Sequence, residues 1–263
     1  MPELPEVEAW RRLAERELVG RRIERVTVTP DEIVLEDPPR RITRALRGAR
    51  VESAERRGKH LWLATDRRPW PLFHFGMSGS FRVYDTAGER PSHLKVELAL
   101  ENGRRLGYRN LRRLGRVRLR EDPLTEPPIS DLGFDPVHDL PGPTAFREIL
   151  ARRKTPIKAL LLNQTVFAGV GNWIADEVLY QARIRPDRVA ADLRPEQVEA
   201  LRRALRTVIR KACEVEADSS RFPRTWLFHV RWGKAHARTR RGEPIRYDTI
   251  GGRTTAWVPQ VQR

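Results

Sequence analysis

The hydrophobic pattern of this 263-residue chain changes its period along the sequence, and this change restricts the fold more than any other feature. Within residues 4–19, apolar side chains such as Val7 and Leu18 recur near the spacing of a helix. From about residue 22 to about residue 120, short stretches alternate in polarity or carry β-branched residues, with turns between them. A leading helix followed by an antiparallel β-sandwich or barrel is therefore predicted.

A proline-rich segment, residues 121–143, separates this part from a second part in which the helical period returns. Three helical stretches are predicted there, at residues 145–153, 157–184 and 194–217. The tail returns to short strand-like pieces with glycine-rich turns. The sequence thus predicts an α+β multidomain protein, with a helix-led β-sandwich domain at 1–125, a linker at 126–143, a helical domain at 144–225 and a hairpin at 226–263.

The charge of the chain indicates the kind of partner it binds. Lysine and arginine total 51 against 35 acidic residues, which gives a net charge of +16. Such an excess favours a polyanionic partner, and duplex DNA is the commonest one. All but 6 of the basic residues are arginine, whose planar fork suits phosphates and base edges, although a GC-rich genome would produce the same bias.

Cysteine usage and hydropathy exclude several classes of protein. The one cysteine, Cys213, rules out an intramolecular disulfide framework and a zinc site built on several thiolates. Its neighbours have helical spacing, so a packed thiol is expected. The first residues do not resemble a signal peptide, and no apolar run approaches the roughly 20 residues that span a bilayer. We expect a soluble intracellular protein, cytoplasmic or associated with the nucleoid.

Five motifs occur along the chain in a fixed order. They are MPELPEVE at the start, RRGKHLWL around Lys59, HFGMSGSF around Met77, AGVGNWIADEVLYQARIRP around Asn172 and GGRTTAWVPQVQ near the end. Together they resemble the formamidopyrimidine-DNA glycosylase and endonuclease VIII family over essentially the whole chain. The resemblance implies a helix-two-turn-helix in the helical domain and a finger at the terminal hairpin.

One departure from the family concerns this finger, which usually holds zinc through four cysteines. The corresponding positions here are Ile245, Asp248, Val258 and Val261, and neither isoleucine nor valine can ligate a metal. The tail therefore resembles the zincless finger of plant and fungal members, and we expect neither a metal nor a cofactor. A decayed, disordered tail is the alternative, but the retained GGRTT and Trp257 argue against it.

Pro2 is the candidate nucleophile. An α-amino group has a pKa of about 7.7–8, against about 10.4 for lysine, so a fair fraction is unprotonated near neutral pH. A secondary amine that attacks a sugar C1′ gives a cationic iminium, which favours elimination of the neighbouring phosphates. An N-terminal proline is commonplace by itself. The resemblance assigns it the nucleophilic role once Met1 is removed.

Two glutamates follow Pro2 closely. The resemblance makes Glu3 the general acid and base, although an acidic residue at a helix start also complements the helix dipole. Glu6 lies one helical turn further on the same side. The family implies a contact between Glu6 and the damaged base, and a solvent-facing carboxylate is the alternative.

Three residues are candidate phosphate ligands. Lys59 follows a glycine in a strand-like run, and the resemblance places it in both the catalytic and the phosphate-binding set. Asn172 follows AGVG before a helix, where helix-terminal N–H groups attract phosphate, although it could simply cap that helix. Arg253 in GGRTT is the expected phosphate ligand of the hairpin. Together the three are expected to hold and bend the damaged strand.

Base chemistry on duplex DNA requires the target nucleotide to leave the stack, and inserted side chains fill the space. The resemblance assigns this to Met77, Arg112 and Leu114. The third position is often phenylalanine in purine-acting relatives, so Leu114 weakens stacking there. Without the family motif, core packing would be the ordinary interpretation of Met77 and Leu114.

The leading hypothesis is a monomeric bifunctional DNA glycosylase and AP lyase that excises oxidised purines from damaged double-stranded DNA in base excision repair. Formamidopyrimidines and further-oxidised guanines are the expected lesions, whereas the short stretch after Cys213 makes strong excision of 8-oxoguanine less expected. Three alternatives stay open: an oxidised-pyrimidine glycosylase, a non-catalytic damage-binding protein and a general basic DNA-binding module.

Overall fold

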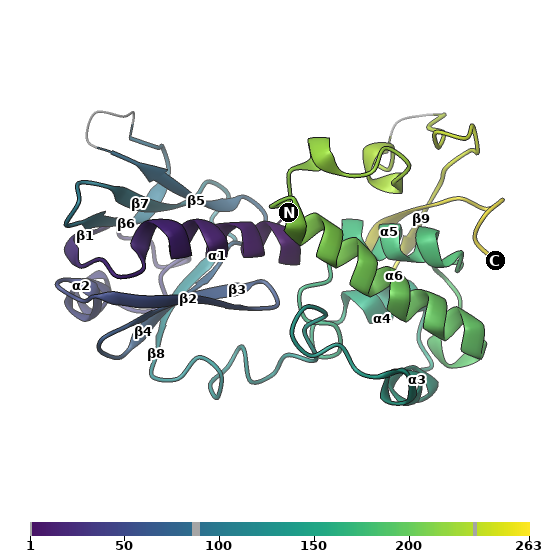
Figure 1. Cartoon of the computed structure of the whole chain (residues 1–263), viewed down its shortest axis with the longest axis horizontal. Coiled ribbons are helices and arrows are strands. Elements are labelled where there is room, and N and C mark those ends of the chain that lie inside the picture. The colour runs from purple at the N-terminus through teal and green to yellow at the C-terminus, as the bar shows by residue number, and fades with distance from the viewer. Residues whose placement is uncertain (1, 86–89, 234–235) are drawn as a thin grey trace. The chain divides into compact units, whose positions relative to one another are not determined.

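The computed structural model describes residues 2–85, 90–233 and 236–263, so Met1 lies outside the described residues. The chain divides into two compact units, one up to Asp131 and one from Leu132 onward. The first holds a leading helix and two β-sheets, and the second holds helices and a terminal β-hairpin (Figure 1).

Helix α1 (Leu4–Leu18) opens the first unit. Pro5 lies in its first turn, where the missing N–H removes no helical hydrogen bond. Its apolar side chains Val7, Ala14 and Leu18 are fully buried. They recur at intervals of seven and four residues and so lie on one face of the helix, which packs against the core of the unit.

The strands of the first unit form two antiparallel sheets of four strands each. One sheet has the order β1 (Ile23–Val28), β6 (Leu94–Leu100), β7 (Arg105–Asn110) and β5 (Gly79–Tyr84). The other has the order β2 (Val51–Arg57), β3 (His60–Thr65), β4 (Trp70–His74) and β8 (Arg116–Arg120). Side chains of both sheets enter one hydrophobic core, which makes this unit a β-sandwich.

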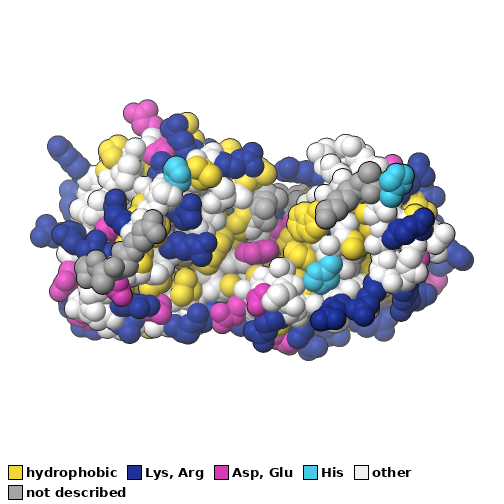
Figure 2. All heavy atoms as spheres, turned by 90° about the horizontal axis from the view of Figure 1, so that it is seen from above, with side chains coloured by type: hydrophobic (Ala, Val, Ile, Leu, Met, Phe, Trp, Pro, Cys, Tyr) yellow, Lys and Arg dark blue, Asp and Glu magenta, His cyan; other side chains and the backbone are white. Residues whose placement is uncertain are grey.

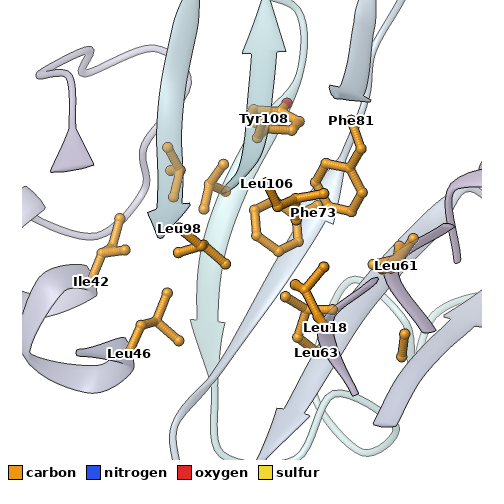
Figure 3. Close-up of a cluster of buried hydrophobic side chains, with 14 of the residues drawn as sticks. Leu18, Ile42, Leu46, Leu61, Leu63, Phe73, Phe81, Leu98, Leu106 and Tyr108 are labelled. Carbon is orange, nitrogen blue, oxygen red and sulfur yellow. The ribbon is translucent and has the colours of Figure 1, made fainter. Parts of the chain in front are cut away.

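Aromatic rings form the centre of that core (Figure 3). Phe73 of β4 lies edge-on to Phe81 of β5 at 5.1 Å between ring centroids, and Tyr108 of β7 lies 5.4 Å from Phe73. These three side chains are at most 1% exposed. Each fully buried ring of this size contributes about 1.5–3 kcal/mol to the free energy of unfolding.

Helix α2 (Pro39–Leu46) lies within the stretch that the pattern assigned to strands, so the sequence prediction was wrong there. Only Ile42 and Leu46 among its residues are buried, and both point into the core beside Leu98 (Figure 3). Two apolar residues four positions apart are too few to show whether the hydrophobic period is that of a helix or of a strand.

The second unit contains α3 (Pro143–Ala151), α4 (Ile157–Leu162), α5 (Asn172–Ala182) and α6 (Pro195–Glu214), with short 3-10 turns η1 (Ala190–Asp192), η2 (Ser219–Arg221) and η3 (Leu227–His229). Cys213 is buried on α6, as predicted. None of the helices among the described residues is long and apolar enough to cross a bilayer.

The helical stretch predicted over 157–184 is two helices, so that prediction is corrected. The break contains Gly169 at a φ of +91°. Gln164 replaces the missing helical hydrogen bonds, because its amide donates to the Val170 carbonyl at 2.8 Å and accepts from the Gly169 N–H at 3.0 Å. Apolar residues continue through the break, so the hydrophobic period alone does not reveal it.

The terminal hairpin pairs β9 (Arg246–Ile250) with β10 (Arg253–Trp257). Gly251 and Gly252 form the turn with φ values of +60° and +71°, which glycine adopts without strain. A Cβ atom on Gly251 would lie 2.9 Å from the Cβ of Ala159 on α4. The absence of a side chain therefore lets the turn pack directly on α4.

Candidate active site

The start of α1 gathers the first three candidate residues. Pro2 is half-buried and precedes Glu3, which is 2% exposed at the N-cap of the helix. The backbone N–H of Glu3 donates to the Glu6 carboxylate at 2.9 Å. This bond fixes Glu6 beside the chain start, so Pro2, Glu3 and Glu6 form one compact group.

The electrostatics of this group favour a protonated Glu6. Desolvation, with the Glu3 carboxylate as a second cause, raises the pKa of Glu6 to about 7. A second carboxylate close by in a poorly solvated place disfavours the ionised form of Glu6. Near neutral pH Glu6 can therefore still offer a proton beside Glu3.

Lys59 lies at the tip of the hairpin between β2 and β3. Arg57 pairs with His60 in this ladder, so Gly58 and Lys59 form a two-residue turn, and Gly58 has a φ of +57°. Glycine at such a turn position is what the RRGK motif supplies. The turn projects Lys59 beyond the sheet, where the side chain is half-buried.

A buried ion pair that the sequence analysis missed supports this turn. The Arg56 guanidinium contacts the Glu8 carboxylate of α1 at 3.2 Å and donates to the Gly58 carbonyl at 3.0 Å. Burial opposes ionisation of Glu8, but hydrogen bonds from Arg11 and the charge of Arg56 hold its pKa below the usual range. Arg56 thus joins α1 to the turn that carries Lys59.

Two histidines lie directly behind Lys59. The rings of His60 and His74 are 4.8 Å apart between centroids on paired strands. Burial, together with the neighbouring cationic side chains, lowers the pKa of His60 well below 6.5 and that of His74 to about 4. Both rings are therefore neutral near pH 7, so the positive charge at this position comes from Lys59, Arg116 and Arg118 and not from the histidines.

The three void-filling candidates lie on two neighbouring loops. Met77 is in the β4–β5 loop, and Arg112 and Leu114 are in the β7–β8 loop. The backbone N–H of Arg112 donates to the Ser78 hydroxyl at 3.0 Å, which joins the two loops. Met77 is 38% and Leu114 45% exposed, so neither packs in the core.

Glycine lets these loops approach closely. A Cβ atom on Gly76, which has a φ of +61°, would lie 2.4 Å from the Leu114 backbone. Behind the loops, the buried Asn110 amide donates to the Phe75 carbonyl and to the Tyr108 hydroxyl. The GMSG motif thus places Met77 on a loop that adjoins the loop of Arg112, above a hydrogen-bonded base.

In the second unit, Asn172 is the first residue of α5, and its side-chain amide donates to the Thr254 carbonyl of β10 at 2.9 Å. The two phosphate candidates of this unit are thereby connected, since Thr254 follows Arg253, which is exposed beside the glycine turn. An amide nitrogen carries two hydrogens, so this bond leaves one donor for a phosphate oxygen.

A buried ionic network, also missed by the sequence analysis, supports both residues. Lys158 of α4 and Asp176 of α5 form an ion pair with fully buried side chains, and Lys158 also donates to the Asn172 carbonyl at 2.9 Å. The second carboxylate oxygen of Asp176 accepts from Arg231 at 2.6 Å and from the Ala256 N–H of β10 at 3.1 Å. One carboxylate therefore ties α4, α5 and the hairpin together.

The residues of the hairpin do not fit a zinc ion. Trp257 donates to the Asp248 carboxylate at 2.7 Å, and Val258 is fully buried. Gln262 accepts from the Val258 N–H at 2.7 Å and donates to the Ile184 carbonyl at 2.9 Å. The described ranges contain no cluster of three or more His, Cys, Asp or Glu side chains, and these contacts hold the hairpin through protein atoms.

Arginine and lysine side chains are spread over much of the face in Figure 2. Within the first unit the structure joins Pro2 with Glu3 and Glu6, and Met77 with Arg112 and Leu114. Within the second it joins Asn172 with the hairpin.

Two family profiles match the chain. The formamidopyrimidine-DNA glycosylase N-terminal domain covers residues 1–117, and the formamidopyrimidine-DNA glycosylase H2TH domain covers residues 132–224. A formamidopyrimidine-DNA glycosylase of Arabidopsis thaliana is 43% identical over 277 residues, with 100% of this chain and 71% of the relative covered. One from Pelobacter propionicus is 32% identical over 270 residues, with both chains fully covered.

Solved structures give the same result. The Lactococcus lactis glycosylase bound non-covalently to DNA with an AP site superposes with a TM-score of 0.88 at 27% identity, over 99% of both chains. Its complex with N7-benzyl-Fapy-dG DNA gives 0.87 at 27% identity, over 100% of both. These matches define a DNA glycosylase. The chain belongs to the formamidopyrimidine-DNA glycosylase family, and the predicted family and fold class are confirmed.

Proposed function

We propose that this protein is a bifunctional DNA glycosylase and AP lyase that removes oxidised purines from duplex DNA inside the cell and acts as a monomer. The observation that carries the proposal is the group at the start of α1, where Pro2, which becomes N-terminal once Met1 is removed, adjoins a buried glutamate and a second glutamate with a raised pKa. Such a group supplies a nucleophile, a base and an acid at one point.

In the proposed reaction, the Pro2 nitrogen attacks C1′ of the damaged nucleotide. The bond from C1′ to the base breaks, and the base leaves with a proton from a carboxylic acid. The amine then loses its N–H proton, O4′ takes up a proton, and the C1′–O4′ bond breaks, which opens the sugar ring and gives an iminium in which the proline nitrogen carries the charge. Loss of a proton from C2′ lets the C3′–O3′ bond break, so the 3′ phosphate departs and the strand is cut.

Glu3 is the proposed general acid and base in these steps. Its low exposure supports the role, because a carboxylate in a poorly solvated site changes its affinity for protons as neighbouring charge develops. Glu6 is the proposed contact to the lesion. Its raised pKa supports this role, because a protonated carboxyl can donate a hydrogen bond to a base.

Lys59, Asn172 and Arg253 are the proposed phosphate ligands. Two of the three lie beside turns that contain glycine, where a DNA backbone can approach closely, and Asn172 lies at a helix N-terminus. Met77, Arg112 and Leu114 are proposed to fill the space that the extruded nucleotide leaves. Their exposure and their joined loops support this role.

The proposed lesions are formamidopyrimidines and further-oxidised guanines. The relatives named as formamidopyrimidine-DNA glycosylases support the purine assignment, and so does a solved relative whose DNA carries N7-benzyl-Fapy-dG. Those names belong to other proteins, so the preferred lesion of this chain has to be measured on the chain itself.

A panel of otherwise identical duplexes tests the proposal. Each carries one formamidopyrimidine, 8-oxoguanine, further-oxidised guanine, oxidised pyrimidine or AP site, and strand cutting is followed under single-turnover conditions with and without borohydride. We expect cutting and covalent trapping, with formamidopyrimidine duplexes cut faster than oxidised-pyrimidine duplexes. Preference for the pyrimidine would reassign the substrate. Binding without trapping or cutting would indicate a damage-binding protein.

A further inference from the structure

A groove outside the candidate active site runs between α2 and β1, entirely within the first unit. Two adjoining hollows of about 550 and 480 Å³ share Thr43 and Arg47 of the α2 region. The first extends over Arg25 and Val26 of β1, and the second reaches Val28 at the end of that strand. The lining of the two hollows thus runs along β1 from Glu24 to Val28.

One wall of the groove carries a stripe of arginines. Arg40, Arg44 and Arg47 recur at intervals of four and three residues, so they lie on one face of α2 and its C-cap, and Arg25 faces them from β1. All four side chains are exposed. Like charges at this helical spacing repel one another and destabilise an isolated helix.

The chain does not neutralise this stripe. In the part of the chain that the structure describes, none of the four arginine side chains makes an ion pair or a hydrogen bond. The adjacent Arg41 does pair, with Asp37 at 2.5 Å. The carboxylate that lines the groove is Glu24. The groove therefore holds a surplus of positive charge.

The stripe is held in place by the opposite face of the helix. Ile42 and Leu46 are fully buried and point into the sandwich core beside Leu98 (Figure 3). Their positions on the helix are turned well away from those of Arg40 and Arg44. The arginines consequently project from a fixed scaffold toward the groove.

The other wall is the edge of a sheet. In the order β1-β6-β7-β5, β1 is an edge strand. Its outer side is bonded at Ile23, whose N–H donates to the Ala49 carbonyl and whose carbonyl accepts from the Gly48 N–H, whereas the described residues from Arg25 to Val28 pair with β6 alone. An edge strand presents backbone donors and acceptors that an extended peptide can pair with. The lining also includes the apolar side chains of Val26, Val28 and Ala99, and neither hollow contains an aromatic ring.

We propose that this groove binds an extended acidic segment of a partner protein, which adds as a strand to β1 and places its carboxylates against the arginine stripe. The apolar lining suits alternate side chains of such a segment. Single-stranded nucleic acid is less suited, because its bases bind through stacking on aromatic side chains, which this groove lacks.

Fluorescence anisotropy tests the proposal with the whole protein and a labelled hexapeptide of alternating Asp and Val. The test variant is Arg40→Glu with Arg44→Glu. The matched control is Arg203→Glu with Arg206→Glu, an exposed pair one turn apart on α6 that, like the test pair, makes no ion pair among the described residues. We expect wild type and control to bind the peptide, and the test variant to bind at least about tenfold more weakly. Cutting of lesion duplexes should stay unchanged in the test variant.

Circular dichroism of each variant establishes that it is folded. A peptide N-methylated at alternate residues should lose affinity, because it cannot complete a strand ladder, and equal binding of that peptide would overturn strand addition.

If both double variants lost peptide affinity equally, the effect would come from net charge alone, and the arginine stripe would not be the binding site. Displacement of the peptide by an undamaged duplex, with matching loss of duplex affinity in the test variant, would make the groove a nucleic-acid surface. Absence of peptide binding up to about 1 mM at low salt would also overturn the proposal.

Discussion

The Arg56 guanidinium lies 3.2 Å from the Glu8 carboxylate, and the arginine side chain is fully buried. The same guanidinium donates to the Gly58 carbonyl. The helix that begins beside Pro2 and the turn that carries Lys59 thus share one buried cation. This relationship gives a structural reason for Arg56, the first arginine in the RRGK motif.

Arg56→Ala should therefore impair both stability and catalysis. Removal of one partner of a buried ion pair lowers the free energy of unfolding by about 3–5 kcal/mol. The loss should be near about 3 kcal/mol here, because Glu8 keeps its contacts to Arg11 and Arg12. Urea unfolding measures the stability, and single-turnover cutting of a lesion duplex measures the rate. Arg50→Ala, an exposed control, should change neither substantially. A stable Arg56→Ala protein with the wild-type rate would contradict this positioning role.

The raised pKa of Glu6 predicts a pH dependence of stability. The unfolded chain releases this proton near its ordinary pKa of 4.5, whereas the folded protein holds it up to about 7. The stabilisation from protonated Glu6 is therefore complete below pH 4.5 and is lost as the pH rises toward 7. Glu6→Gln keeps a neutral side chain, so its stability relative to wild type should increase between pH 5 and pH 8.

Denaturant unfolding at several pH values measures this difference. Glu32→Gln, which replaces an exposed glutamate, serves as the control and should show no such trend. A stability difference between Glu6→Gln and wild type that stays constant from pH 5 to pH 8 would show that the carboxyl is already ionised in the folded protein.

Met77→Ala and Leu114→Ala should separate function from stability. Both side chains are exposed by more than a third, so their loss should change the free energy of unfolding by no more than about 0.5 kcal/mol. Excision from a lesion duplex should slow several-fold, because the vacated stack is then poorly filled. Leu124→Ala, at a leucine that is 58% exposed, controls for the general loss of surface apolar area. Unchanged excision in both variants would remove these residues from the proposed mechanism.

The terminal hairpin should be independent of metal. Treatment with a chelator should alter neither the melting temperature nor strand cutting, because protein contacts such as the bond from Trp257 to Asp248 hold the hairpin. Trp257→Phe removes that bond and should weaken duplex binding while the rest of the protein stays folded. Activity that disappears with chelator and returns with zinc would contradict this account.

The sequence predicted the turns at Lys59 and Arg253, but it did not predict the buried ion pairs that support them. Lys59 and Arg253 each lie beside a glycine with positive φ, and such glycines are visible in RRGK and GGRTT. The roles of these residues remain proposals. Arg56, Lys158 and Asp176 were not predicted, because their partners lie 18 to 55 residues away and only the tertiary structure brings them together.

The sequence also predicted some secondary-structure elements correctly and missed others. Helix α1 was predicted at 4–19 and found at Leu4–Leu18, since its apolar period is long and regular. Helix α2 was missed because Ile42 and Leu46 are its only buried side chains. The break between α4 and α5 was missed because Gln164, a polar residue within an apolar run, satisfies the loop through hydrogen bonds that no periodicity encodes.

The location of the covalent bond to DNA tests the central claim most directly. A lesion duplex is trapped with borohydride, the complex is digested, and mass spectrometry identifies the modified peptide. Pro30→Gly, at an exposed proline of the same unit, should trap like wild type, whereas Pro2→Gly should lose most trapping. The account predicts a sugar remnant on the Pro2 nitrogen of a chain that lacks Met1. Retained Met1, or an adduct on another residue such as Lys59, would contradict it.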